Sequence, residues 1–201
     1  MIKNAIYVVT DIEADGIDIA RNSMLSFASV AISVDGREVS SFEAVLSPLD
    51  SASPDPRTTA WFRAQPGAYT AAMLNPKPPA DVMADFVAWI RALQGEAIFV
   101  AHPLMFDGPW IDRYLRLFTD DRLYEGPWKS DRLFMHPGLC LASFAAGRLG
   151  WPVWDCQITK YPLEWLGHHQ HTHRAIDDAR GYGRLLAHLL ARNPTFHGRS
   201  K

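Results

Sequence analysis

The chain has 201 residues, of which 48% are apolar and 21% are charged, and its formal net charge is −2 at pH 7. These values are typical of one globular domain with a buried core, and they argue against a broad basic surface for long nucleic acid. A protein that grips only a few nucleotides at a chain end needs no such surface. The two cysteines have no metal-binding spacing, and no signal sequence or membrane-spanning run is recognisable, so we expect a cytoplasmic protein that enters no membrane.

The N-terminal part of the chain predicts strands and loops. Three apolar, β-prone runs have the composition of buried strands and cover residues 5–10, 25–33 and 39–46. Asp35-Gly36 separates the last two runs and is a strong hairpin signal. The stretch 47–56 is rich in Pro, Ser and Asp, and it predicts a surface loop.

Helices and strands alternate in the rest of the chain. Apolar residues at helical spacing (Val82, Phe86, Trp89, Ile90 and Leu93) predict a helix that ends at Gly95. A short strand at 97–101 follows, and the remaining helices are expected at 109–118, 139–149 (closed by Gly150) and 174–191. The order predicts an α/β fold in which a mixed sheet is flanked by helices. We expect a single domain over residues 1–201, with its core at about 5–191 and a tail at 192–201.

Two acidic residues at the end of the first strand are the first candidate site. Asp11 and Glu13 are two positions apart, so in a strand their side chains lie on the same face. Acidic residues are uncommon in strands, and two on one face repel each other unless a positive charge lies between them. A divalent cation is the natural candidate.

The second candidate residue is Asp107, in the stretch His102-Pro-Leu-Met-Phe-Asp107-Gly-Pro-Trp110 that follows the strand 97–101. Ligands of open α/β sheets collect beyond the carboxyl ends of strands, and a carboxylate there is well placed to reach a metal ion. Capping of the helix that follows is an equally good explanation, because Asp is a common N-cap residue.

The third patch is His173-Arg-Ala-Ile-Asp177-Asp178-Ala-Arg180. One of the two acids is explained by the helix dipole, and the two side chains lie about 100° apart on a helix, so they cannot face one point. His173 stands just before the helix, where a side chain with a pKa near neutrality is suited to deprotonating water. Taken alone, it is more simply an exposed loop histidine.

Together, the three patches resemble a known family. The order DIE, HxxxFDxxW and HRAIDDA resembles the DEDDh exonucleases of the ribonuclease H-like superfamily, over residues 6 to about 190. The stretch 58–66 is more loosely similar to phage exonuclease A and its relatives. The resemblance implies a ribonuclease H-like fold with a five-stranded mixed sheet flanked by helices.

The resemblance also implies a role for each matching residue. Asp11, Glu13, Asp107 and Asp178 would bind two Mg²⁺ or Mn²⁺ ions, and His173 would be the general base. The five-residue step from the histidine selects Asp178, which leaves Asp177 as the helix-start acid. Substrate contacts are expected from Ile12, Ala14, Phe106, Trp110 and Trp61, although core packing explains both tryptophans as well. Pro103 departs from the family, which usually has Asn there, and Trp110 stands where many relatives have Phe.

The function that this resemblance implies is a metal-dependent 3′→5′ exonuclease. It would release nucleoside 5′-monophosphates from the 3′ ends of single-stranded or short RNA or DNA, and a homodimer is compatible with it. A phosphoesterase of small nucleotides or dinucleotides is the main alternative. A zinc site built from the histidines at 168, 169, 171 and 173 is a second, and a non-catalytic binding module is a third.

Overall fold

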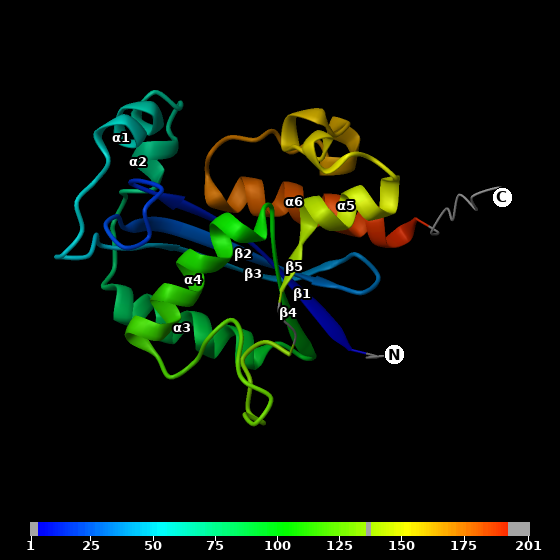
Figure 1. Ribbon diagram of the computed structural model, residues 1–201, viewed down its shortest axis with the longest axis horizontal. Coiled ribbons are helices and arrows are strands. Elements are labelled where there is room, and N and C mark those ends of the chain that lie inside the picture. Colours follow the sequence, from blue (N-terminus) through cyan, green and yellow to red (C-terminus); the bar gives the residue numbers. More distant parts are fainter. Residues whose placement is uncertain (1–3, 136–137, 193–201) are drawn as a thin grey trace.

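A computed structural model describes residues 4–135 and 138–192. Its centre is a five-stranded sheet with the order β3-β2-β1-β4-β5 (Figure 1). The strands are β1 (Ala5–Ala14), β2 (Met24–Ser33), β3 (Glu38–Val45), β4 (Glu96–Ala101) and β5 (Leu139–Cys140). β1, β4 and β5 run parallel, whereas β2 is antiparallel to both β1 and β3. The predicted mixed sheet is therefore confirmed.

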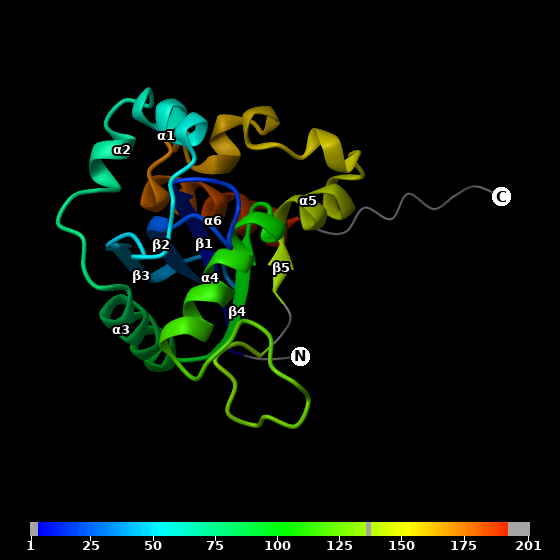
Figure 2. The ribbon, with the colours of Figure 1, turned by 60° about the vertical axis from the view of Figure 1, so that its left-hand side comes forward.

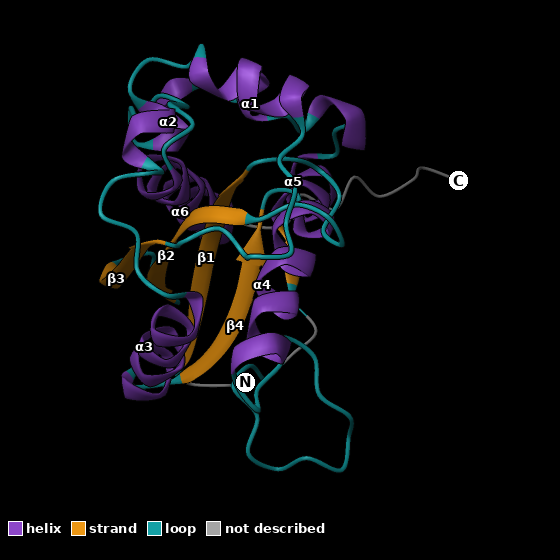
Figure 3. Cartoon of the chain, turned by 90° about the vertical axis from the view of Figure 1, so that its left-hand side faces the viewer, coloured by secondary structure: helices purple, strands orange, loops and turns teal. Residues whose placement is uncertain are grey.

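Helices cover both faces of this sheet. They are α1 (Pro56–Arg63), α2 (Ala68–Ala71), α3 (Pro79–Ala92), α4 (Leu104–Phe118), α5 (Leu141–Leu149) and α6 (Ala175–Ala191), with 3₁₀ turns at Val153–Asp155, Ile158–Lys160 and Leu163–Leu166. α3 and α4 lie on one face and α5 and α6 on the other (Figures 1 and 2). α1 and α2 lie beyond the end of the sheet that contains the C-terminal end of β1 (Figure 3). No helix among the described residues is long and apolar enough to cross a membrane.

β1 separates two hydrophobic cores. Val8 packs into the core under α3 and α4, and its neighbour Val9 packs into the core under α5 and α6. This alternation is the two-residue period of a strand that is buried on both faces. The strand continues to Ala14, beyond the predicted end at residue 10, because its pairing with β2 persists through Glu13. The central strand thus carries its two acidic residues into the interior.

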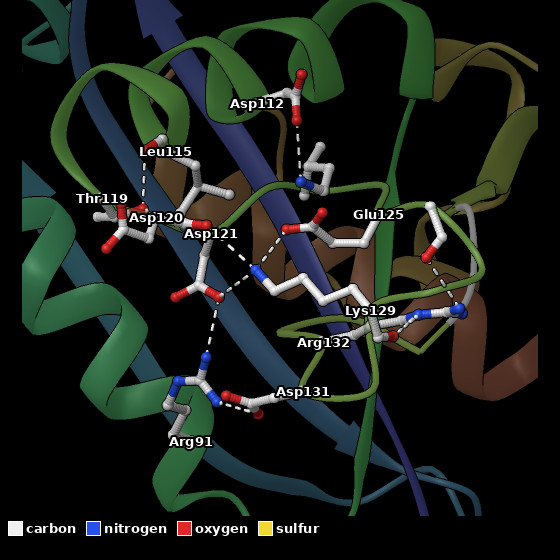
Figure 4. Close-up of polar contacts among 12 residues, drawn as sticks. Arg91, Asp112, Leu115, Thr119, Asp120, Asp121, Glu125, Lys129, Asp131 and Arg132 are labelled. Atoms are coloured by element: carbon white, nitrogen blue, oxygen red, sulfur yellow. Dashed lines mark hydrogen bonds and ion pairs between the residues drawn. The ribbon is translucent and has the colours of Figure 1, made fainter.

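The segment between α4 and β5 is held by ion pairs rather than by regular structure (Figure 4). The guanidinium of Arg91 donates to the carboxylates of Asp121 (2.9 Å) and Asp131 (2.8 Å). Lys129 pairs with Glu125 at 2.8 Å. These contacts tie the segment to α3, on the face of the sheet opposite α6.

Two helix starts differ from the predictions. α4 begins at Leu104 rather than at residue 109, so Pro109 lies inside it. Burial of Asp107 and Gly108 in the first turns outweighs the one backbone hydrogen bond that a proline cannot make. The helix predicted at 139–149 begins only at Leu141, because its first two residues form the short strand β5, which pairs with β4. The predicted tail at 192–201 lies outside the described residues, except for Arg192.

The two glycines expected to end helices behave differently. Gly150 follows α5 with a φ of 69°, as a C-terminal glycine should. Gly95 is not such a cap, because α3 ends at Ala92 and its C-cap is Leu93 in an extended conformation. A Cβ on Gly95 would lie 2.2 Å from the carbonyl oxygen of Asn4, so close packing against the start of β1 requires glycine here.

We therefore expect Gly95→Ala to destabilise the fold by about 1–3 kcal/mol, because backbone must shift to admit the methyl group. Gly147→Ala is the matched control: it lies within α5, and a Cβ there meets nothing within 4 Å. It should stabilise the protein by about 0.5–1 kcal/mol, since glycine is a poor helix former. Urea unfolding of both variants measures the difference, and equal effects would contradict the packing argument.

Candidate metal centre

The end of β1 supplies the first two carboxylates. Asp11 and Glu13 are largely buried, with 7% and 9% of their surface exposed. Their neighbour Ile12 packs into the opposite core with α3 and α4. Alternation along the strand therefore places both acids on one face, as predicted, and this is the face that α6 covers.

The start of α6 supplies the third carboxylate. Asp178 accepts hydrogen bonds from the backbone N–H groups of Thr172 (2.9 Å) and His173 (3.0 Å), and its Oδ2 lies 2.8 Å from Nδ1 of His171. Carboxylate oxygens of Asp11, Glu13 and Asp178 lie within 4.8 Å of one another. Asp177 instead accepts a hydrogen bond from the hydroxyl of Thr172. The acid that faces the β1 pair is thus Asp178.

The first turn of α4 supplies the fourth carboxylate. Asp107 is buried, and its Oδ1 accepts a hydrogen bond from the backbone N–H of Ile12 at 3.3 Å. The N-cap of α4 is Pro103, so the alternative in which Asp107 caps the helix is wrong. Its Oδ2 is buried without a hydrogen-bond partner among the described residues. A buried polar atom without a partner requires an explanation, and a bound cation provides one.

The electrostatics of the cluster fit a cation. Burial, followed by the charges of Asp107, Glu13 and Asp178, raises the pKa of Asp11 well above its ordinary value. Burial is also the main cause that raises the pKa of Glu13 to about 9 and the pKa of Asp107 to about 8. All donors are carboxylate oxygens, which hard divalent ions such as Mg²⁺ prefer. The cluster fits such ions better than it fits four unpaired anions.

His173 stands at the rim of this cluster. Its ring makes an edge-to-face contact with Trp61 (centroids 4.8 Å apart) and another with His171 (4.2 Å). Burial, and then the charge of His171, lowers the pKa of His173 despite the nearby Asp178. A neutral imidazole is a proton acceptor at pH 7. The histidine therefore lies in a loop at the cleft, where it is half-buried rather than fully exposed.

A cleft of about 670 Å³ opens over these side chains. Four of the five predicted substrate contacts line it: Ile12, Ala14, Trp61 and Phe106. Trp110 does not, because it is fully buried in the core under α3 and α4. Trp110 lies one helical turn after Phe106, which is exposed in the first turn of α4. Because the indole of Trp110 is buried, it offers no face to a base. Core packing is the correct interpretation of Trp110.

Other side chains that were not among the predicted site residues also line the cleft, and they include His102, His171 and Tyr182. The rings of His102 and Tyr182 are stacked with centroids 5.1 Å apart, and burial lowers the pKa of His102 to about 4. His102 belongs to the second motif, and Tyr182 is one helical turn after Asp178. Spacing could therefore have revealed both.

The predicted zinc alternative does not have the required geometry. Among the described residues, only two of the four histidines, His171 and His173, approach a common carboxylate, Asp178. His168 and His169 are absent from that group and from the cleft lining. A four-histidine site is therefore not formed.

Comparisons with known proteins agree with this geometry. The model of the RNase T exonuclease family matches residues 8–186. The nuclease domain of 3′hExo, described as a DEDDh family member bound to rAMP, is 12% identical with a TM-score of 0.65, and the match covers 94% of this chain and 92% of that chain. Exonuclease I has a TM-score of 0.70 at 15% identity, and its E. coli form with a dT13 oligonucleotide has 0.65 at 16%. Both exonuclease I matches cover 94% of this chain but only 42% of the other.

No curated protein sequence matches the chain significantly. The structural likeness confirms the predicted fold class.

The carboxylate cluster predicts an unusual pH dependence in metal-free protein. Because the pKa of Glu13 is raised from 4.5 to about 9, the folded state holds this proton more tightly than the unfolded state. Its stabilising contribution is complete below pH 4.5 and is lost as the pH rises toward 9. In EDTA, we expect Glu13→Gln to raise the Tm at pH 8 by about 4 °C or more and to flatten its fall between pH 5.5 and 8.

The control for this experiment is Glu164→Gln, an exposed glutamate that does not line the cleft. It should follow the wild type at every pH. Mg²⁺ should raise the Tm of the wild type at pH 8 and raise that of Glu13→Gln much less. A wild-type Tm that responds to neither EDTA nor Mg²⁺ would contradict the assignment of a metal centre.

Proposed function

The chain belongs to the RNase T exonuclease family, whose members depend on divalent metal ions, and on this premise we propose that it is a 3′→5′ exonuclease of single-stranded or short nucleic acid. The products would be nucleoside 5′-monophosphates. Two Mg²⁺ or Mn²⁺ ions would be held by Asp11, Glu13, Asp107 and Asp178. The exonuclease activity that the three motifs predicted is confirmed by the family match.

One observation carries this proposal: four carboxylates from three separate elements converge beside a histidine, and three of them, Asp11, Glu13 and Asp107, line the same cleft as that histidine. Such a set is costly for stability, because burial and mutual repulsion both penalise the charged forms. A protein that only bound a ligand would have no use for it. The same set is what hydrolysis of an anionic phosphodiester requires.

The carboxylates have distinct positions. The charges of the other three carboxylates all raise the pKa of Asp11, so Asp11 would hold the ions together with them. Oxygens of Glu13 and Asp178 lie within 4.8 Å of Asp11, and Asp107, from α4, accepts a hydrogen bond from the N–H of Ile12, the next residue along β1. When bound, ions of this kind neutralise the phosphate, lower the pKa of a coordinated water and stabilise the leaving 3′-oxygen. Asp178 also accepts hydrogen bonds from the loop that carries His173, so it holds the base beside the ligands.

His173 would accept the proton from the attacking water. Its lowered pKa keeps the imidazole neutral at pH 7, and its contact with Trp61 limits the orientations of the ring. The terminal nucleotide would lie between two aromatic side chains at the mouth of the cleft, Trp61 and Phe106. Stacking of this kind accepts any base. The strand end at Ile12 and Ala14 would face the terminal sugar.

The direct test is release of nucleotides from a single-stranded oligonucleotide in Mg²⁺ or Mn²⁺. A free 3′-hydroxyl should allow stepwise release of 5′-mononucleotides from the 3′ end, whereas a 3′-phosphate should block it and a 5′-phosphate should have no effect. Resolution of products by length and by end label distinguishes the outcomes. Internal cleavage, or hydrolysis of dinucleotides alone, would contradict the proposal, the latter favouring the small-nucleotide phosphoesterase.

Neighbouring aspartates provide the control. Asp178→Asn should lower kcat by about 10²–10³-fold, because one anionic ligand of the site is lost. Asp177→Asn should retain most of the activity, since Asp177 points away toward the hydroxyl of Thr172. If Asp177→Asn is the inactive variant, the ligand has been assigned to the wrong residue.

The role of His173 has its own test. His173→Ala should lower kcat by about 10²–10⁴-fold, the usual contribution of a general base, while Mg²⁺ still raises the Tm. His168→Ala is a matched control, because both histidines adopt a left-handed backbone, with φ of 58° and 63°. The His168→Ala variant also places an alanine at a left-handed backbone position, so it carries the same backbone strain, but it should keep full activity. Loss of Mg²⁺ binding in His173→Ala would indicate direct coordination instead.

A further inference from the structure

A second hollow, of about 600 Å³, adjoins the catalytic cleft. It lies between the loop that joins β1 to β2 and the loop that precedes α1. The two hollows share Ile17, Asp55 and Arg57 in their walls, so they lie side by side. We call the second hollow the arginine groove, after Arg21 and Arg57, which both line it.

The walls of the arginine groove are fixed to each other. The backbone N–H of Ser53 donates to the carbonyl oxygen of Arg21, and the side-chain amide of Asn22 donates to the carbonyl oxygen of Ser53, both at 2.7 Å. The backbone N–H of Asp55 donates to the carbonyl oxygen of Asp15 at 2.8 Å. The last contact ties the groove to the residue two positions after Glu13. The groove is therefore preformed and held in register with the metal centre.

The acidic side chains of the groove are engaged by backbone donors. Oδ1 of Asp18 accepts the N–H of Ala20 at 2.9 Å. Oδ1 of Asp55 caps α1 by accepting the N–H groups of Arg57 and Thr58, and these bonds contribute to the lowered pKa of this carboxyl. Such carboxylates are held in place and are less available to a ligand.

The arginine side chains are free by comparison. Arg57 is 92% exposed, and its contact with Asp55 is a long one of 3.4 Å. No hydrogen bond or ion pair of the Arg21 guanidinium is found within the described residues. Guanidinium groups bind phosphate oxygens in a bidentate manner, which makes these two side chains the anion donors of the groove.

Apolar surfaces alternate with these cations along the path out of the cleft. Trp61 lines the cleft and is half exposed, and Ile17, on the shared wall, is 76% exposed. Apolar surfaces for bases beside cations for phosphates are the features that single-stranded nucleic acid requires. The exposed side chain of Ile17 is available for contact with a base at the place where the two hollows meet.

We propose that the arginine groove binds the backbone phosphates of the nucleotides on the 5′ side of the scissile bond, so that the enzyme prefers single-stranded chains of several nucleotides over dinucleotides. This inference rests on the proposed function for its direction, since the 3′-terminal nucleotide then occupies the catalytic cleft. Arg57 contacts the phosphate nearer the cleft because it lines both hollows, and Arg21 contacts one farther away.

The test is equilibrium binding, which is separate from turnover. A fluorescent phosphorothioate-linked decathymidylate, which resists hydrolysis, is titrated in Mg²⁺ against the wild type, Arg21→Ala, Arg57→Ala and the double variant. Each single substitution should weaken binding by about three- to tenfold. Each should also reduce the slope of log K against log salt by about 0.7, the value for one phosphate contact on a single strand.

The matched control is Arg37→Ala, which removes the same charge from an exposed side chain in the β2–β3 turn, where neighbouring Gly36 lies against the C-terminal half of α6. It should bind the decamer like the wild type.

The corresponding dinucleotide, used as a competitor, should lose less affinity than the decamer in Arg21→Ala. Three outcomes would overturn the proposed role of the arginine groove. Decamer binding and the salt slope could be unchanged in both variants, or the decamer and the dinucleotide could lose affinity equally. The third is a wild type that binds neither ligand. A wild type that binds the decamer as expected but hydrolyses no oligonucleotide would instead overturn the nuclease assignment and leave the groove standing.

Discussion

The repulsion among four buried carboxylates is the constraint on which the rest of this structure depends. Burial and neighbouring charge both raise the pKa of Asp11, and burial is the main cause that raises the pKa of Glu13 and of Asp107, so without a cation these three side chains favour the protonated form. The fold can hold this cluster because each member is anchored elsewhere. Asp11 and Glu13 belong to a strand buried between two cores, while Asp107 and Asp178 lie in the first turns of helices that pack on opposite faces. Hydrophobic packing in the two cores therefore stabilises the fold and offsets the cost of burying these carboxylates close together.

Asp178 links that cluster to the proton-accepting side of the site. A carboxylate has about four acceptor positions, and three donors already point at this one: two backbone N–H groups and the ring of His171. The loop before α6 thus takes its conformation from a residue of the metal centre. The left-handed backbone at His173 belongs to the same arrangement, since its N–H must turn toward the helix start while its ring faces Trp61. The candidate metal ligand Asp178 and the proposed base His173 are therefore positioned as one unit.

The sequence alone predicted what depends on short-range periodicity. A two-residue step places Asp11 and Glu13 on one face of a strand, and this remains true in any fold that buries the strand. It could not predict that α4 begins at Leu104, because Pro109 is a strong local signal for a helix start and only the burial of Asp107 and Gly108 overrides it. Trp110 was expected among the substrate contacts because of the resemblance, and its burial follows from the position of this helix over the core. His171 was missed for a different reason: its contact with Asp178 exists only because the loop folds back on α6.

A nearly neutral protein can bind a polyanion when its positive and negative groups are concentrated in different places on the surface. The net charge of −2 describes an average over the chain, whereas a ligand meets individual groups. In the cleft, the carboxylates would hold divalent cations, and bound cations would supply the positive charge that one phosphate requires. In the adjoining groove the acids are held by backbone donors and the guanidinium groups face outward. The first device recognises the phosphate that reacts, and the second recognises those that do not. Because only the first depends on metal ions, loss of metal removes catalysis while leaving the cationic part of the substrate path in place.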